Sequence, residues 1–113
     1  MDPEQIASIC HEANRAYSWA IGDRSITHWE NAPDWQRISA VRGVEGILNG
    51  TIHSAESAHE SWLEEKREGG WKYGPVKDAD LLEHPAYIAY DLLPLQQKRK
   101  DALFFAIVNA LKD

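Results

Sequence analysis

The sequence predicts a mainly α-helical fold of four helices, with a short β-hairpin or extended Trp-x-Tyr-Gly-Pro segment between the third and the fourth. Two observations carry this prediction. Apolar residues recur every three or four positions in four separate stretches, which is the spacing of a buried helix face. Residues 69–78 then combine three glycines, a proline and two aromatic residues, too much Gly and Pro for a helix. At 113 residues, the chain is expected to form one domain over residues 1–113.

The first helix has a clear beginning and end in the sequence. Asp2 can cap it, Pro3 suits its first position, and Gln5 completes a capping box. Gly22 is expected to end it. His11 falls on the side predicted to be polar. The predicted apolar stripe consists of Ile6, Ile9, Cys10, Ala13, Tyr17 and Ala20.

The second helix is predicted to begin at Pro33 and to stop at Asn49-Gly50. Gly43 and Gly46 lie inside it, and each costs up to about 1 kcal/mol relative to alanine. Close packing of another helix would be a reason to keep them. The predicted buried face consists of Trp35, Ile38, Val41, Val44, Ile47 and Leu48.

The third helix follows Ser54, a suitable N-cap, and is expected to stop at Gly69-Gly70. Its charged run over residues 64–68 is interpreted as a solvated end. Its predicted stripe is Ala55, Ala58, His59, Trp62 and Leu63. The fourth helix is predicted over residues 94–112, with an apolar face of Phe104, Ile107, Val108 and Leu111.

The 69–93 segment is long for a connection, and such segments are usually functional or carry short structure of their own. In an extended chain, Trp71 and Tyr73 would lie on one face and Lys72 on the other. We expect the segment to pack against the first and third helices. Aromatic rings displayed beside lysines can form a ligand platform. They can equally form a small satellite core, in which Trp62 and Trp71 hold the loop onto the helices.

Residues in and around this segment follow an ordered motif. A helix with His and Trp leads into Gly-Trp-x-Tyr-Gly-Pro-Val-Lys-Asp, then His-Pro, then Tyr-Asp-x-Leu-Pro. The residues concerned are His59, Trp62, Gly70, Trp71, Tyr73, Gly74, Pro75, Val76, Lys77, Asp78, His84, Pro85, Tyr90, Asp91, Leu93 and Pro94. On these residues, the run 57–94 resembles the ryanodine-receptor repeat (RyR) domain of the stand-alone bacterial and phage type. One departure is Ala86-Tyr87-Ile88-Ala89, where receptor-type repeats more often have Cys, Leu or Val and a Pro before the Tyr.

The resemblance carries functional implications. Stand-alone prokaryotic RyR-like domains look like small-molecule sensing modules in nucleotide signalling and antiviral defence, and are proposed to bind nucleotide-derived ligands. A phage-encoded domain of this kind would sequester such a signal, whereas a host-encoded one would sense it.

Composition bounds the partners and the compartment. A net charge of −6 argues against binding a nucleic-acid polymer, which needs a basic face. The longest apolar run, residues 102–108, is too short to span a membrane, and the acidic N-terminus lacks an apolar signal region. A single cysteine, Cys10, excludes an intramolecular disulfide framework. We therefore expect a cytoplasmic protein that does not enter membranes.

The sequence does not point to an enzyme. Its five histidines include no His-x-x-x-His pair and no Cys/His cluster, so no metal site and no cofactor are predicted. Cys10 lies on an apolar stripe, where a buried, inert thiol is expected. The carboxylates of the third helix alternate with Lys66 and Arg67 and are interpreted as a solvated face.

A non-catalytic ligand site is the leading prediction. Aromatic rings can stack on nucleobases, lysine and arginine can hold phosphates, and a glycine lets the backbone approach a ligand. The predicted ligand-binding residues are Arg15, Tyr17, His59, Trp71, Lys72, Tyr73, Gly74, Lys77 and Tyr90. His59 has a second interpretation, as a core histidine that fixes a loop through a backbone hydrogen bond. The rival function is a protein-interaction module, including a homodimer, that uses the same aromatic surface.

Overall fold

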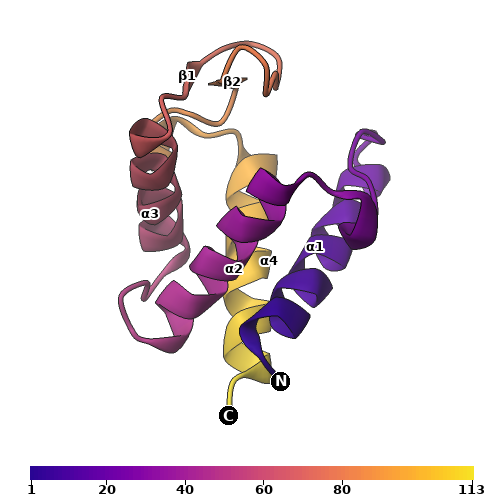
Figure 1. Ribbon diagram of the computed structural model, residues 1–113, viewed down its shortest axis with the longest axis vertical. Helices are drawn as coiled ribbons and strands as arrows, with labels where there is room; N and C mark the ends of the chain where they lie inside the picture. Colours follow the sequence, from indigo (N-terminus) through magenta and orange to yellow (C-terminus); the bar gives the residue numbers. More distant parts are fainter.

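The computed structural model describes residues 1–113. Its helices are α1 (Pro3–Ala20), α2 (Asp34–Leu48), α3 (Ala55–Glu68) and α4 (Leu95–Leu111) (Figure 1). There are two 3-10 turns, η1 (Trp29–Asn31) and η2 (Tyr90–Leu92). There are also two short strands, β1 (Lys72–Tyr73) and β2 (Glu83–His84). This confirms the predicted mainly α-helical fold with four helices. Figure 1 shows α4 behind α2, with α1 and α3 on either side and the strands beyond one end of the helices. Both termini lie at the opposite end.

The predicted helix ends are confirmed by their caps. The Gln5 N–H donates to Asp2 Oδ1 at 2.8 Å, and the Asp2 N–H donates to Gln5 Oε1 at 3.0 Å. Ser54 and Ser57 cap α3 in the same reciprocal way. The glycines that follow α1, α2 and α3 within two residues have positive φ angles, which glycine adopts without strain: Gly22, Gly50 and Gly70.

The apolar core lies where α1, α2 and α4 meet. It consists of Ile6, Ala7, Cys10, Val44, Ile47, Ile52 and Val108. Gly43 confirms the predicted close approach of another helix, because a Cβ there would lie 3.1 Å from the Phe104 ring of α4. Gly46 is approached instead by Ile52, which belongs to the connection between α2 and α3.

Four of the residues predicted to be buried are exposed: Ala20 at the end of α1 and three larger side chains. Ile38 and Leu48 expose 50% and 40% of their surface, and Ile9 exposes 39%. Ile38 lies about 120° around α2 from the buried Val44, since each helical residue turns the chain by about 100°. Leu48 is the last residue of its helix. The apolar stripes are therefore wider than the surfaces that neighbouring helices cover.

The two strands pair in parallel, with Lys72 opposite Glu83 and Tyr73 opposite His84. The hairpin alternative was therefore wrong. Between the strands the chain reverses twice, because Asp78 and Glu83 form an antiparallel bridge with two backbone hydrogen bonds of 2.9 Å. The strands approach closely at Gly74, where a Cβ would lie only 2.5 Å from the Glu83 Cβ.

The 69–93 segment is anchored by Trp71 on α2 and α3, and not on α1 and α3 as predicted. The Trp71 ring lies 5.1 Å from the Trp35 ring of α2, and the Lys66 ammonium of α3 lies 5.3 Å from it. Tyr73, by contrast, exposes 55% of its surface. The two aromatic rings of the motif therefore have different environments.

The later part of the segment is held by two histidines. His59 Nε2 donates to the Ile88 carbonyl at 2.8 Å, as its core interpretation predicted. His84 Nδ1 accepts from the Ala86 N–H at 3.0 Å and shapes the turn that leads to Tyr87. Helix α4 begins after Pro94 without a side-chain cap.

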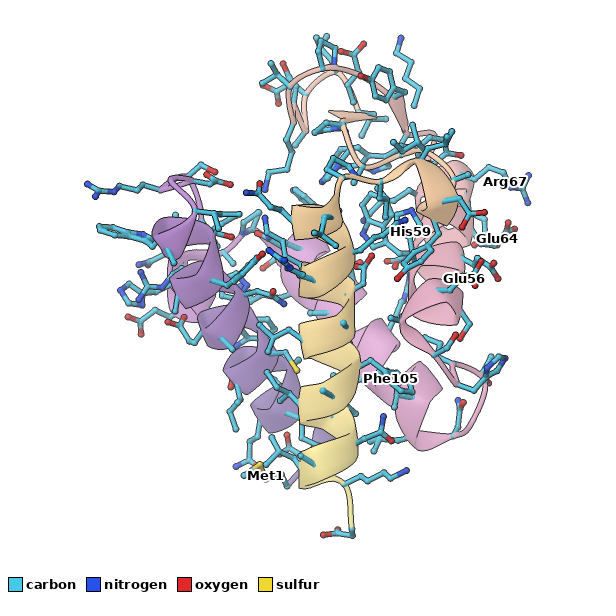
Figure 2. All side chains as sticks on the ribbon, turned by 180° about the vertical axis from the view of Figure 1, so that it is seen from behind. Met1, Glu56, His59, Glu64, Arg67 and Phe105 are labelled. Carbon is cyan, nitrogen blue, oxygen red and sulfur yellow. The ribbon has the colours of Figure 1, made fainter.

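The charged end of α3 is only partly solvated. Glu64 and Arg67 form an exposed ion pair on the outer side of the helix (Figure 2). Lys66, in the same run, is only 4% exposed, which corrects the prediction of a wholly solvated end. No helix of the structure combines the length and apolar character that crossing a membrane requires.

Candidate functional site

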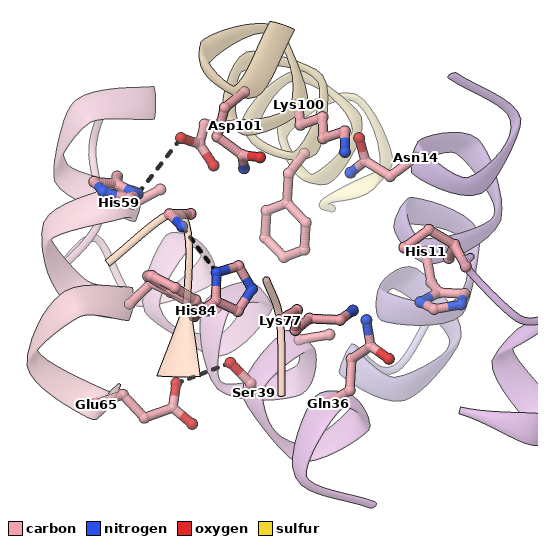
Figure 3. A pocket seen from close by; sticks show the side chains of 18 of the residues that line it. His11, Asn14, Gln36, Ser39, His59, Glu65, Lys77, His84, Lys100 and Asp101 are labelled. Carbon is pink, nitrogen blue, oxygen red and sulfur yellow. Dashed lines mark hydrogen bonds and ion pairs between the residues drawn. The ribbon is translucent and has the colours of Figure 1, made fainter. Parts of the chain in front are cut away.

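A cavity of about 620 Å³ lies between the helices and the 69–93 segment (Figure 3). All four helices contribute side chains to its wall. The segment contributes Val76 and Lys77 from the chain between the strands, together with His84 and the two residues that follow it. The cavity therefore places residues far apart in the sequence around one space.

Helix α1 faces the cavity with a polar stripe. His11, Asn14 and Ser18 follow one another at helical spacing and all line the cavity. His11 is 9% exposed and donates from Nε2 to the Thr27 carbonyl at 2.7 Å. His11 lies on a polar side of α1, as predicted, but this side is buried and faces the cavity. Asn14 Oδ1 and Ser18 Oγ are buried without a hydrogen-bond partner.

Two tryptophans, Trp35 and Trp62, form the aromatic part of the wall. Behind them the Lys66 ammonium lies 4.9 Å from the Trp35 ring, 5.8 Å from that of Trp62 and 5.3 Å from that of Trp71. Burial lowers the pKa of the Lys66 ammonium. The three indole faces stabilise this buried cation by cation–π attraction, since it has no carboxylate within 4 Å.

Two further lysines line the cavity without an ion-pair partner. Neither Lys77 nor Lys100 has a carboxylate within 4 Å. Lys77 is exposed as a whole residue, but its ammonium lies 6.0 Å from the Trp35 ring and desolvation lowers its pKa. Asp23 and Asp101 line the same cavity as counter-charges. Hydrogen bonds from Ser25 lower the pKa of Asp23, and the charges of Lys100 and Lys77 contribute to that shift. Lys77 and Lys100 are thus cavity cations without an ion pair, whereas Arg42 faces Glu65.

Across the cavity, His59 of α3 faces Asp101 of α4. His59 Nδ1 lies 3.7 Å from Asp101 Oδ2, and this oxygen is buried without a hydrogen-bond partner (Figure 3). Burial raises the pKa of Asp101 to about 7. Burial also lowers the pKa of His59. Near neutral pH, Asp101 therefore exists in both protonation states beside a neutral imidazole.

His84 completes this part of the wall as a neutral imidazole. Burial, and then the charges of Lys77, Lys66 and Lys100, lower its pKa to about 4. Its Nδ1 accepts a backbone hydrogen bond, so the ring hydrogen is on Nε2. It is an uncharged hydrogen-bonding group near neutral pH.

Of the residues predicted to bind a ligand, His59 and Lys77 line the cavity. Trp71 lies behind the wall against Lys66. The Tyr90 ring lies 6.1 Å from the His59 ring and has the Lys98 ammonium 5.3 Å from its centre, outside the cavity.

The other predicted residues lie away from the cavity. Arg15 Nε donates to Glu12 at 3.1 Å, and Lys72 Nζ lies 3.7 Å from Glu83. Both cations therefore have carboxylate partners. The remaining three are Tyr17, whose hydroxyl is buried without a partner, the exposed Tyr73, and Gly74 in the strand pair.

Several cavity residues were not among the predicted ones, notably Asn14, Ser18, Gln36, Lys100 and Asp101. A signal for those on α4 was present: Gln97, Lys100 and Asp101 precede Phe104 at helical spacing and continue the apolar stripe of that helix. The polar stripe of α1 likewise adjoins its apolar one. A polar run that extends a buried stripe indicates a cavity wall.

The sequence matches the model of a known protein family. The family model of the RyR domain matches residues 36–111, which are 76 of the 113 residues. The match extends from α2 through α4 and includes the whole motif over residues 57–94. It covers about two thirds of the chain, and the chain belongs to the RyR domain family.

Proposed function

We propose that this protein is a non-catalytic binding module for a small phosphorylated ligand, most plainly a nucleotide-derived signal that it senses or sequesters in a bacterium or phage. The observation that carries the proposal is the cavity with two lysines, Lys77 and Lys100, that have no ion-pair partner. Cations held in a partly desolvated space favour an anionic occupant.

Size and wall chemistry support the same class of ligand. Cavities of about 300–1,000 Å³ are usual for small-molecule sites, and this one has about 620 Å³. Trp35 and Trp62 offer apolar surfaces on which a planar ring can pack. The polar groups of α1 and α4 would orient the ligand.

Among the cations suggested by the sequence, Lys77 is the one best placed for a phosphate. Arg15 and Lys72 already face Glu12 and Glu83, respectively. Lys100 joins Lys77 as the second phosphate contact. Binding without catalysis is supported by the one thiol, Cys10, which is buried in the core and whose pKa burial raises to about 12.

The experiment is a thermal-shift screen against mononucleotides, cyclic nucleotides, cyclic dinucleotides and ADP-ribose derivatives, followed by calorimetry on any hit. Ligand at a hundred times its Kd adds about 2.7 kcal/mol to the free energy of unfolding, a shift of several degrees. Lys77→Ala and Lys100→Ala should each weaken binding by about tenfold or more, because each removes a charge-assisted contact.

Lys72→Ala is the matched control. It removes the same charge from the same segment, but outside the cavity, and should leave the affinity within about twofold. Equal losses in all three variants would mean that net charge alone drives binding. An absence of any shift across the whole panel would count against a phosphorylated ligand.

A protein-interaction module is the second candidate, and one observation favours it. Tyr73, Val76 and Leu81, all near the strand pair, expose 55%, 70% and 61% of their surface. Sedimentation velocity over a range of concentrations tests it. Self-association that survives Lys77→Ala but fails in Tyr73→Ala would support this candidate, including the homodimer.

A further inference from the structure

The geometry points to a second subsite in the cavity, which accepts a hydrogen bond from the ligand. Asp101 Oδ2 and His59 Nδ1 together accept it from an N–H or O–H group of the phosphorylated ligand. This inference rests on the proposed function and adds a second requirement for the ligand besides its phosphate. The ligand must carry hydrogen-bond donors as well as an anionic group.

The tautomer of His59 is set by the backbone. Its Nε2 lies 2.8 Å from the Ile88 carbonyl, which can only accept, so the ring hydrogen is on Nε2. In the neutral imidazole Nδ1 therefore carries a lone pair. That lone pair points toward Asp101 (Figure 3).

The two groups face one another without a hydrogen bond. Their separation of 3.7 Å is longer than a hydrogen bond, and Asp101 Oδ2 has no other partner although it is buried. Buried polar atoms are nearly always paired in folded proteins, so this oxygen is available to accept from a donor group in the cavity. A donor group of a ligand in the cavity satisfies Asp101 and finds a second acceptor in His59.

The subsite is separate from the phosphate contacts although Lys100 and Asp101 are consecutive. Successive residues of a helix do not face the same way. Figure 3 shows Lys100 on the side of Asn14 of α1, and Asp101 on the side of His59 of α3. Phosphate at the lysines and a donor group at Asp101 would therefore be different parts of one ligand.

The required donor can come from either of two parts of a nucleotide. A base offers N–H groups and a ribose offers hydroxyls, and both present the same chemistry to Asp101. The experiment separates them with four kinds of phosphorylated probe. These are phenyl phosphate, which has a ring but no donor beyond its phosphate; ribose 5-phosphate; the four ribonucleoside 5′-monophosphates; and their 2′,3′-dideoxy forms.

For the wild-type protein, calorimetry should show at least one donor-bearing probe binding tenfold or more tightly than phenyl phosphate. A dideoxy form that keeps this preference assigns the donor to the base. A preference shared by ribose 5-phosphate and lost in the dideoxy forms assigns it to the sugar. In Asp101→Leu, the preference should vanish while the affinity for phenyl phosphate changes less than twofold.

Proton exchange gives a second readout that does not depend on Asp101→Leu folding. A donor that bonds the carboxylate lowers its pKa, so binding at pH 7 should release up to about half a proton more in the wild type than in Asp101→Asn. Calorimetry in two buffers of different ionisation enthalpy measures this difference. The comparison of the two proteins is needed because other titratable groups line the same cavity, namely His11, Asp23, Arg42, His59, Glu65, Lys77, His84 and Lys100.

The outcomes are distinct. Asp91→Asn, which neutralises an exposed carboxylate before α4, is the control and should match the wild type in both assays. Equal affinity of the wild type for phenyl phosphate and for every donor-bearing probe overturns the inference. So does a result in which the Asp101 variants keep both the preference for donor-bearing probes and the proton release of the wild type. If Lys77→Ala still abolishes binding in that case, the proposed function stands alone. Binding of no probe overturns both.

Discussion

Asp101 and His84 line the same cavity but have opposite effects on how stability depends on pH. The pKa of Asp101 is raised to about 7 in the folded protein, above its ordinary value of 3.8. That of His84 is lowered to about 4, below its ordinary value of 6.5. Between about pH 4 and 6.5 the folded state holds a proton at Asp101 that the unfolded state has released, and lacks one at His84 that the unfolded state has bound. The two contributions largely cancel.

The Asp101→Asn variant removes the contribution of Asp101 to the pH dependence of stability. As the pH rises from 4 to 7, Asp101 destabilises the wild type increasingly, by up to about 4 kcal/mol, because its burial opposes ionisation. The variant should therefore gain stability relative to the wild type over that interval. Urea unfolding at pH 4, 5.5 and 7 measures the difference, and a difference independent of pH would contradict the raised pKa.

The His84→Asn variant removes the contribution of His84 to the pH dependence of stability. Asparagine keeps a side-chain acceptor for the Ala86 N–H, but it cannot be protonated. The wild type should lose stability relative to the variant as the pH falls from 6.5 to 4, by about 3 kcal/mol. Urea unfolding of both proteins across this pH interval measures the difference, and a difference independent of pH would contradict the lowered pKa.

At the scale of elements, the first part of the 69–93 segment is anchored by one aromatic ring. Trp71 is its contact with α2 and α3, through the Trp35 ring and the Lys66 side chain. Trp71→Ala should cost about 3 kcal/mol and loosen the strands over the cavity. Trp19→Ala is the matched control: that ring is 46% exposed on α1, and its loss should cost less than about 1 kcal/mol. Urea unfolding compares the two, and equal costs would refute the anchoring role.

The helices were predictable because their caps and stripes are local. The capping box at Asp2 and the N-cap at Ser54 need only residues three apart, and both appear as predicted. The parallel pairing of the strands was not predictable, since it depends on two chain reversals set by Asp78 and Glu83. The cavity was only partly predictable. His59 and Lys77 belong to the family motif, whereas Asp101 lies outside it and acquires its raised pKa from burial that only the assembled helices create.

At the scale of the whole molecule, α1 completes what the family match describes. The match begins at residue 36, within α2, yet α1 contributes three residues to the core and the polar stripe of the cavity. Removal of α1 is therefore expected to disrupt both the apolar core and the cavity. Deleting residues 1–22 should abolish cooperative unfolding, which circular dichroism during heating measures. A deletion variant that melts cooperatively would show that the matched region folds alone.

The single thiol reports on this cooperativity. Cys10 is fully buried between α1 and α4, with Sγ 3.9 Å from the Phe104 carbonyl, and its pKa is raised to about 12. A thiol reagent should label it only when the helices separate, so the labelling rate should follow the unfolding equilibrium as urea is added. Rapid labelling without denaturant would show that α1 opens independently of the rest.

The cluster of Trp35, Trp62 and Trp71 around Lys66 has a spectroscopic consequence. The Trp35 and Trp71 rings lie 5.1 Å apart at an angle of 51°, close enough and tilted enough for their electronic transitions to couple. Such coupling produces a paired positive and negative band in circular dichroism, a signal that isolated indoles lack. Trp35 and Trp62 also line the cavity, so an occupant would change the emission of these indoles directly. The protein thus contains its own optical probe of occupancy, and binding can be followed without a label.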